Sequence, residues 1–342
     1  MVMIGIRGKK ENATLADVAG LAGVSISATS KALLGGGGKT TKVSETTASR
    51  IREAAQVLGY HPNSAARQLK TGKSNIIGAI IHSEAPHVYY ARFAKIQQRL
   101  AKMGYCFMVG QSDGSVELIE RYLDEFRSRK ADVIISAFFD APGKTKRLKQ
   151  IYSGLRNVLY MGRPDFNNAS YVEPNTRDGI VQIVNYLVTK GIKRAAIDIV
   201  DKFYRPGKMR VAGYLEGMRK NGLPLDESLI IKHDGDLRFV SATVRQALDR
   251  GARAIIASND LRAVMIIKEL KRLKINVPDE MRVTGFDNME FAAFSSPALT
   301  TIDPRDDEIA AAAIAMIKCF LAEKRFPENI VIKPDLVIRE SA

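Results

Sequence analysis

Several side chains suited to binding a small polar ligand follow apolar runs that are typical of buried strands. Arg210 carries a planar fork of donors that can hold two acceptors at once, whereas Asp287 offers only acceptors. Aromatic rings beside such groups suit a ring-shaped polar ligand. Arg210 and Asp287 together suit a ligand with acceptors and donors on one edge, as a sugar, a nucleoside or a polyol acid has. The candidate ligand-binding residues are His82, Tyr89, Tyr90, Ser136, Phe138, Phe139, Arg163, Asn175, Arg210, Asn259 and Asp287. For each, a structural ion pair or a helix cap is the alternative role.

These residues do not form a catalytic set. No Ser-His-Asp arrangement, metal-ligand cluster or dinucleotide-binding glycine loop is readable, and the four histidines are scattered. The run from Gly35 to Gly38, followed by Lys39, resembles the end of a phosphate-binding loop, but Leu33 stands where that motif needs a glycine. We therefore expect a flexible turn at this run, no enzyme activity, no metal and no cofactor beyond a small bound ligand.

The elements that must position the ligand-binding groups alternate between strand and helix from residue 75 onward. Short continuous apolar runs predict strands at 76–81, 105–109, 132–135, 158–161, 195–200, 254–257 and 282–286. Amphipathic patterns between them predict helices that include 93–103, 116–129, 178–190 and 209–221. This alternation is typical of doubly wound α/β layers, and the length suits two such lobes. Ligands of these folds bind beyond the carboxyl ends of the strands, and we expect Arg210 to open a helix there.

A different pattern precedes the α/β part. Thr14 and Asp17 predict a capped helix start, with Val18, Leu21 and Ala22 as its apolar face. Gly23 is expected to end this helix, and Ser25 to cap a second helix over 26–34. A third helix should begin at Ser44 and bury Ile51, Ala55 and Leu58. Two short helices joined by a glycine turn predict a helix-turn-helix, although a small helical hairpin without a DNA role is the alternative.

The second helix offers a face for reading DNA. Ile26, Ser27 and Lys31 should point outward, where the isoleucine can contact a thymine methyl and the lysine can reach guanine acceptors. The alternative for Ile26 is a packing contact within the helical unit. Ser25, Ser30 and Asn63 are better suited to phosphate or backbone contacts than to base edges.

The order and spacing of these residues resemble a known family of DNA-binding proteins. The chain resembles the headpiece and hinge of the LacI/GalR family of bacterial transcriptional regulators over some sixty residues, and more weakly over 75–342. The matching segments are Thr14-Leu15-x-Asp17-Val18-Ala19-x-x-Ala22-Gly23-Val24-Ser25, Ser30-Lys31-Ala32-Leu33, Val43-Ser44, Leu58-Gly59-Tyr60-x-Pro62-Asn63, Ala66-Arg67-x-Leu69-x-Thr71-Gly72, Arg210-Val211-x-Gly213-Tyr214, Asn259-Asp260 and Gly285-Phe286-Asp287-Asn288.

The resemblance implies a domain plan. It comprises a small all-α helix-turn-helix headpiece at 1–61, a hinge helix and linker at 62–74, and a bilobed α/β domain similar to periplasmic binding proteins at 75–342. It places the effector between two doubly wound parallel sheets, with chain crossings near Glu173, Asp303 and Lys333. It further implies a homodimer that binds a pseudo-palindromic double-stranded DNA operator and responds to a small-molecule effector.

The resemblance also implies roles for individual residues, and the chain departs from the family pattern at several positions. It adds Ala66 and Leu69 of the hinge to the DNA-binding residues, with Leu69 as a wedge in the minor groove. It assigns Arg210 and Asp287 to ligand hydroxyls or a carboxylate. The turn that contains Gly35 to Gly38 is longer than is usual in the family, Leu237 stands where a stacking aromatic is common, and the chain has no tryptophan. We therefore do not expect the aromatic surface on which a pyranose ring usually stacks.

Composition agrees with a nucleic-acid partner. The net charge is +15, and residues 1–75 hold eleven Lys or Arg against four Asp or Glu. Cys106 and Cys319 lie in apolar runs and are expected to be buried free thiols. The basic, polar start lacks the apolar core of a secretory signal, and no apolar run approaches the about 20 residues of a membrane span. We expect a cytoplasmic transcriptional repressor. The rival hypothesis is a periplasmic-type solute-binding protein without a transcriptional role, but it leaves the helix-turn-helix unexplained.

Overall fold

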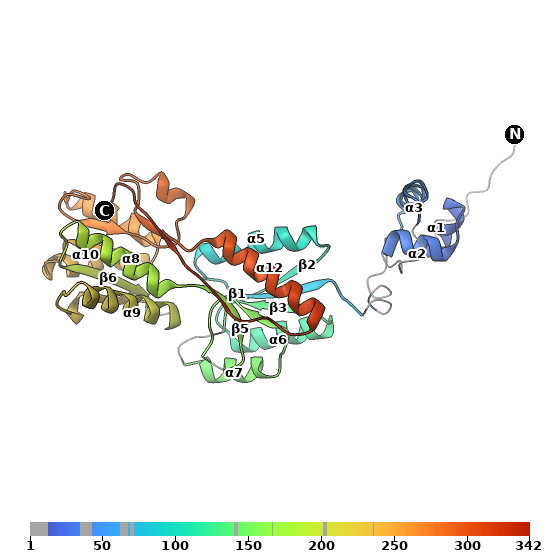
Figure 1. Cartoon of the computed structure of the whole chain (residues 1–342), viewed down its shortest axis with the longest axis horizontal. Helices are drawn as coiled ribbons and strands as arrows, with labels where there is room; N and C mark the ends of the chain where they lie inside the picture. Colours follow the sequence, from blue (N-terminus) through green and yellow to red (C-terminus); the bar gives the residue numbers. More distant parts are fainter. Residues whose placement is uncertain are drawn as a thin grey trace. The chain divides into compact units, whose positions relative to one another are not determined.

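The fold is described from a computed structural model of the chain. The structure describes residues 13–34, 43–61, 68, 72–139, 143–165, 167–200, 204–234 and 236–342. They fall into two compact units, residues 1–74 and residues 75–342, and each is described by itself (Figure 1).

The first unit is a bundle of three helices. They are α1 (Leu15–Ala22), α2 (Ile26–Leu34) and α3 (Glu45–Val57). Thr14 and Asp17 form a full capping box, and Gly23 ends α1 in the left-handed conformation that favours glycine, as the sequence predicts. The small core joins Val18 and Ala22 of α1 to the alanines of α3 and to Ile51, which has no exposed surface. The predicted helix-turn-helix with a third supporting helix is confirmed.

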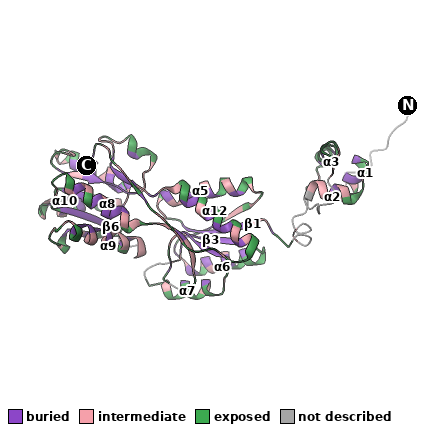
Figure 2. Cartoon of the chain, in the orientation of Figure 1, coloured by how far each residue is buried: buried purple, intermediate pink, exposed green. Residues whose placement is uncertain are grey.

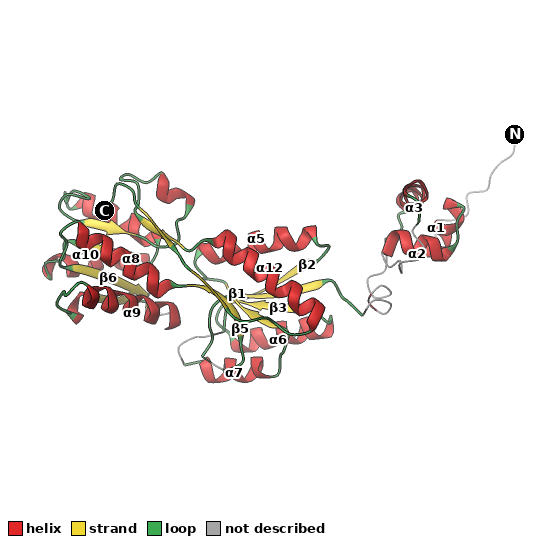
Figure 3. Ribbon diagram, in the orientation of Figure 1, coloured by secondary structure: helices red, strands yellow, loops and turns green. Residues whose placement is uncertain are grey.

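The second unit begins with a lobe built on a six-stranded parallel sheet of order β11-β5-β4-β3-β1-β2. The strands are β1 (Ile76–His82), β2 (Cys106–Ser112), β3 (Val133–Ser136), β4 (Val158–Tyr160), β5 (Ser170–Pro174) and β11 (Ile330–Ile332). Helices α5 (His87–Lys102) and α12 (Asp306–Glu323) pack on one face, and α6 (Val116–Ser128) and α7 (Thr145–Ser153) pack on the other. Figure 3 shows the strands between these helices, and Figure 2 shows that buried residues follow the strands.

The other lobe repeats this plan on a four-stranded parallel sheet of order β7-β6-β8-β9. The strands are β6 (Ala195–Val200), β7 (Ile230–His233), β8 (Ala254–Ile256) and β9 (Arg282–Thr284). Helices α8 (Thr176–Thr189) and α9 (Tyr204–Lys220) cover one face, and α10 (Val240–Asp249) and α11 (Asp260–Arg272) cover the other. In both lobes the strand order reverses beside the first strand, which is where doubly wound folds bind ligands.

Three chain segments cross between the lobes. The first leaves β5 for α8, and the second leaves β10 (Thr301–Asp303) for α12. The third leaves β11 for β12 (Asp335–Val337), which pairs antiparallel with β10. The crossings lie where the sequence predicts them, near Glu173, Asp303 and Lys333.

Helix α12 is fixed to the first lobe by charge as well as by packing. Arg92 of α5 donates two hydrogen bonds to Asp306, at 2.9 and 2.7 Å, and Lys95 pairs with Asp307 at 2.6 Å. The acidic residues lie in the first turn of α12, where negative charge is favourable at a helix N-terminus. Figure 1 shows α12 beside α5 after the chain has crossed from the other lobe.

Two burial expectations are wrong. Cys106 is exposed because it begins β2, which is an edge strand of the six-stranded sheet, and Cys319 is half-buried. Leu21 is 55% exposed because α1 turns Val18, Ala19 and Ala22 toward the core instead. No helix in the described ranges is long and apolar enough to cross a membrane.

Candidate functional site

The start of α2 presents an exposed apolar and polar face. Ile26 is 53% exposed, so the alternative of a buried packing contact fails, and Ser27 beside it is exposed. Ser25 is also exposed and caps the helix, since its Oγ accepts the Ala28 N–H at 3.1 Å. Lys31 lies in the last turn of the same helix and Ser30 precedes it; both are half-buried. Of the face that the sequence assigns to base edges, Ile26 and Ser27 are therefore exposed, whereas Lys31 is half-buried.

Thr29 packs the inner face of α2. Its side chain is fully buried, and its hydroxyl donates to the Ser25 carbonyl oxygen at 3.1 Å. Asn63, Ala66 and Leu69, which the sequence assigns to the hinge, lie outside the described residues, as do Gly35 to Gly38.

The second unit holds a cavity of about 240 Å³ between its two lobes. The first lobe contributes groups at the ends of its strands, including His82 at the end of β1 and Phe138 after β3. The other lobe contributes Val200 at the end of β6, and Ser258 and Phe286 after β8 and β9. The ligand position expected beyond the carboxyl ends of the strands is thus a cavity lined by both lobes.

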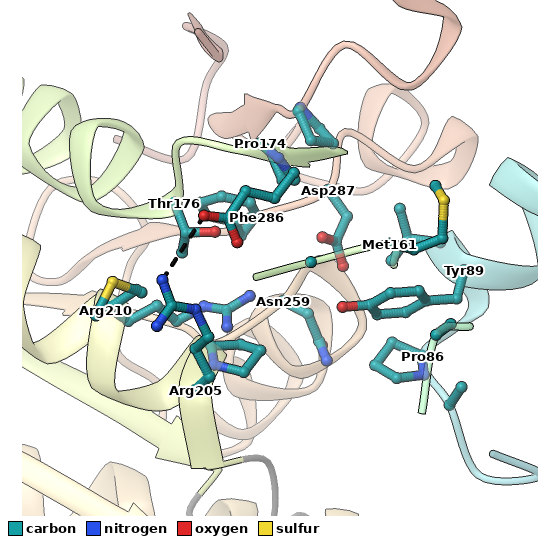
Figure 4. Close-up of a pocket in the computed structure, with 18 of the residues that line it drawn as sticks. Pro86, Tyr89, Met161, Pro174, Thr176, Arg205, Arg210, Asn259, Phe286 and Asp287 are labelled. Carbon is teal, nitrogen blue, oxygen red and sulfur yellow. Dashed lines mark ion pairs between the residues drawn. The ribbon is translucent and has the colours of Figure 1, made fainter. Parts of the chain in front are cut away.

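Eight of the predicted residues line this cavity together. They are His82, Tyr89, Phe138, Phe139, Asn175, Arg210, Asn259 and Asp287. Figure 4 shows the Tyr89 hydroxyl directed toward Asn259 and Asp287 in the middle of the site, with Pro86 and Met161 near the ring. The side-chain oxygen of Asn259 caps α11 by accepting the Arg262 N–H at 2.9 Å, so its amide nitrogen remains as a donor. The cavity combines apolar faces at one end with polar groups in the middle.

Three predicted residues lie outside the lining of the cavity. The Tyr90 hydroxyl donates toward the backbone oxygens of His82 and Ser83, so it braces the loop after β1. Ser136 is fully buried and shares a hydrogen bond with the Tyr152 hydroxyl at 2.8 Å, which makes it a core residue.

Arg163 is the third predicted residue outside the lining. Its side chain is exposed, and only its backbone N–H reaches a cavity residue, donating to the Glu173 carboxylate at 2.9 Å. Leu237 does not line the cavity either.

Arg210 faces the cavity from a different place in the helix than the sequence suggested. Helix α9 begins at Tyr204, so Arg210 lies in its second turn and does not open it. The guanidinium carbon lies 4.9 Å from the centre of the Phe286 ring, and the Nε atom is buried without a hydrogen-bond partner. Burial lowers the pKa of the guanidinium, and the nearby Asp287 carboxylate opposes that shift.

Asp287 is held in a strained loop. Its φ of 112° is rare for a residue with a side chain, and its N–H donates to the Ile302 carbonyl oxygen at 2.9 Å. Gly285 before it has no room for a Cβ, which would lie 2.2 Å from an Asp260 side-chain oxygen. Burial raises the pKa of the Asp287 carboxyl well above its ordinary value; the Asp260 carboxyl adds to the shift and Arg210 opposes it.

Asp260 supports this loop from beneath and does not line the cavity. It is fully buried, accepts the Met289 N–H at 2.7 Å and accepts the hydroxyl of Thr301. Burial raises the pKa of Asp260 to about 7, against the effect of these hydrogen bonds. Asn288 extends the loop to the chain crossing by donating to Asp303 at 3.0 Å.

The sequence reasoning missed several lining residues. Arg92 and Glu173 come from the interiors of α5 and β5, and Arg205 and Thr176 come from first turns of helices. Arg205 could have been predicted from the sequence, because it is a charged residue that follows β6 closely in the chain, at the end of the strand where ligands bind. No group of three or more His, Cys, Asp or Glu side chains in the described part of the chain is placed to hold a metal ion.

Known proteins share both units. The model of bacterial regulatory proteins of the lacI family matches residues 14–63, and the model of a periplasmic binding protein-like domain matches residues 184–342. The ribose operon repressor of Escherichia coli strain K12 is 26% identical over 333 residues, which cover 96% of this chain and 100% of the relative. The HTH-type transcriptional regulator DegA of Bacillus subtilis strain 168 is 28% identical over 334 residues, which cover 96% of this chain and 97% of the relative.

Solved structures share the fold. The Lac repressor bound to ONPG in the repressed state superposes with a TM-score of 0.81 at 20% identity, over 97% of this chain and 100% of that one. A complex of the transcriptional regulator CelR with cellobiose has a TM-score of 0.70 at 22% identity, over 97% and 100% of the two chains. These likenesses support the same architecture for the two units.

Proposed function

Because this chain belongs to the LacI/GalR family of bacterial transcriptional regulators, we propose that it is a DNA-binding repressor whose operator affinity is controlled by a small polar ligand. The observation that carries the proposal is one chain with both an exposed helix-turn-helix and a lined cavity between two α/β lobes. The ligand is sugar-like or nucleoside-like, and a sugar agrees with the ribose operon repressor among the relatives.

The proposed mechanism couples the cavity to DNA through the lobes. Ligand binding changes how the lobes close, and this alters the spacing of the paired hinge segments in a homodimer on a pseudo-palindromic operator. Such coupling between two sites amounts to about 1–3 kcal/mol in typical allosteric proteins. The chain acts in the cytoplasm, has no catalytic activity and needs no cofactor apart from its effector.

Selection of DNA by the full-length protein tests this function. Double-stranded oligonucleotides of random sequence are passed over the protein through several rounds, and the bound sequences are read. The proposal requires enrichment of a site with two inverted halves, and a ligand that shifts its affinity. A protein that binds sugars but enriches no DNA sequence would be the solute-binding protein of the rival hypothesis.

Operator affinity should fall steeply with salt. Residues 1–75 carry eleven basic against four acidic residues, so phosphate contacts are expected to supply much of the binding energy. Each neutralised phosphate adds about −0.9 to the slope of log affinity against log salt. Fluorescence anisotropy of the full chain between low and physiological salt measures this slope. A slope near zero would contradict an interface dominated by phosphate contacts.

Lys31→Ala should relax the preference at one base pair of each half-site. A lysine on the reading helix that contacts guanine acceptors contributes about 1–3 kcal/mol of discrimination there. Anisotropy with the selected operator and its single-base variants measures the effect, with thermal unfolding as the control for the headpiece fold. Equal weakening on every sequence would instead make Lys31 a phosphate contact.

A further inference from the structure

Two arginine side chains in the cavity have donors that the protein does not use. The Nε atoms of Arg205 and Arg210 are both buried and have no hydrogen-bond partner among the described residues. Both residues project from the first two turns of α9, and Figure 4 shows them at the same end of the cavity, opposite Pro86 and Tyr89. A buried donor without a partner is costly, so two of them at one end of a cavity call for an acceptor from outside the chain.

The nearby carboxylates form ion pairs with Arg205 but no hydrogen bond to the Nε atom of either arginine. Arg205 lies 3.7 Å from a Glu173 oxygen and 3.8 Å from an Asp165 oxygen, and both distances exceed a hydrogen bond. Arg210 has no carboxylate within ion-pair distance in the described part of the chain, and its ring contact with Phe286 supplies no acceptor oxygen.

The other two arginines of the lining are already occupied. Arg92 pairs with Asp306 at 2.7 Å and Arg177 pairs with Glu216 at 2.5 Å, and neither partner lines the cavity. Arg205 and Arg210 are thus the guanidinium groups of the lining whose Nε donors stay open to a ligand. A guanidinium binds carboxylate or phosphate through two parallel hydrogen bonds, and both groups are acceptors only.

We propose that the effector is a small polyol or sugar that carries an oxyanion, carboxylate or phosphate, and that Arg205 and Arg210 bind this oxyanion. This inference rests on the proposed function, since it assigns a chemical class to the ligand of that site. The hydroxyl groups of the ligand lie at Asn259 and Asp287, and its carbon skeleton packs against Tyr89 and Phe138.

The charge of the cavity agrees with this assignment. The lining carries four arginines against two carboxylates, Glu173 and Asp287. The cavity volume of about 240 Å³ is small for a ligand site, which suits a single sugar unit with its acid group.

Matched pairs of compounds test the class of ligand on the full-length protein. The carboxylate arm compares D-gluconate with D-glucitol and D-glucuronate with D-glucose, and the phosphate arm compares D-ribose 5-phosphate with D-ribose and inorganic phosphate with chloride. Thermal unfolding at constant ionic strength ranks the probes, and calorimetry measures the dissociation constant of the best one. We expect at least one anionic probe to stabilise the protein more than its neutral partner, and the arm in which it falls identifies the oxyanion.

Arg205→Gln removes one guanidinium and keeps a long polar side chain. It should raise the dissociation constant of the best anionic probe at least tenfold and leave the binding of the neutral compounds unaffected. Arg219→Gln is the matched control, because it removes the same charge from an exposed position of the same helix, outside the cavity, and should leave the dissociation constant unchanged.

Three results would overturn the proposal. They are equal stabilisation by neutral and anionic partners, no anionic probe that separates wild type from Arg205→Gln, and equal losses in Arg205→Gln and Arg219→Gln. A neutral sugar that releases the operator would refute the oxyanion while the proposed regulator remains. Failure to select any DNA would refute the regulator while binding of the anion remains measurable.

Discussion

Asp198→Ala is expected to lower the free energy of unfolding of residues 75–342 by about 3–5 kcal/mol, because it leaves the buried Arg262 guanidinium without its partner. The Asp198 carboxylate is fully buried in β6 and accepts two hydrogen bonds from Arg262, at 2.7 and 2.8 Å. His233 of β7 approaches it at 2.8 Å, and the Ser258 hydroxyl donates to it at 3.1 Å. One carboxylate therefore ties two strands and α11 together beneath the ligand cavity. Chemical denaturation followed by circular dichroism measures the loss.

Two further variants make this result specific. Asp124→Ala breaks the exposed Arg127–Asp124 pair of α6 and should change the stability little, since exposed ion pairs contribute little. A double replacement, Asp198→Leu with Arg262→Met, should be less destabilising than Asp198→Ala because it leaves no unpaired buried charge. A single variant as stable as wild type would contradict the structural role of Asp198.

The same carboxylate predicts a loss of stability in acid. Burial alone raises the pKa of Asp198, but the hydrogen bonds from His233 and Arg262 outweigh it and lower the pKa from 3.8 to about 2. A carboxyl whose pKa is lower in the folded state stabilises the fold above its unfolded pKa. The contribution is therefore complete above about pH 4 and is lost as the pH falls toward 2. Asp198→Ala should flatten the stability profile over this interval.

Much of the fold can be predicted from the sequence because its strong patterns are local. All seven predicted strands are present, since continuous apolar runs between amphipathic helices leave few other arrangements. The strands that were missed, β5, β7, β10, β11 and β12, are short or lie at edges and crossings, where polar residues interrupt the pattern. Their positions depend on pairing between distant segments, such as Thr301 with Val337, which no local pattern encodes.

The ligand cavity was predicted less completely than the fold. Residues at the ends of strands or shortly after them, such as His82, Phe138 and Asp287, line the cavity, because strand ends alone place them there. Tyr90 and Ser136 also follow or end strands, but their side chains turn into the protein to satisfy hydrogen bonds. The direction of a side chain depends on helix rotation and on partners far along the chain, which the linear order of residues does not contain.

Arg210→Ala is expected to abolish the response to effector while operator binding persists. Removing one partner of a buried, hydrogen-bonded charge interaction costs about 2–5 kcal/mol, which is roughly thirtyfold or more in affinity. The DNA-reading face belongs to a separate compact unit, so its fold does not depend on Arg210. Arg210→Lys should lose the response as well, because an ammonium group cannot hold two acceptors in the plane of a fork or stack on Phe286 as a guanidinium does.

The measurement pairs calorimetry of the effector with anisotropy of the operator on both variants and on Arg219→Gln, the exposed control on the same helix. The loop that carries Asp287 is hydrogen-bonded through Asn288 to Asp303 at a chain crossing, so a ligand held between Arg210 and Asp287 acts directly on a segment that joins the lobes. Loss of the response in both Arg210 variants, with intact operator affinity, would agree with this route. A normal response in Arg210→Lys would show that charge alone suffices, and that the guanidinium fork does not transmit ligand binding to DNA.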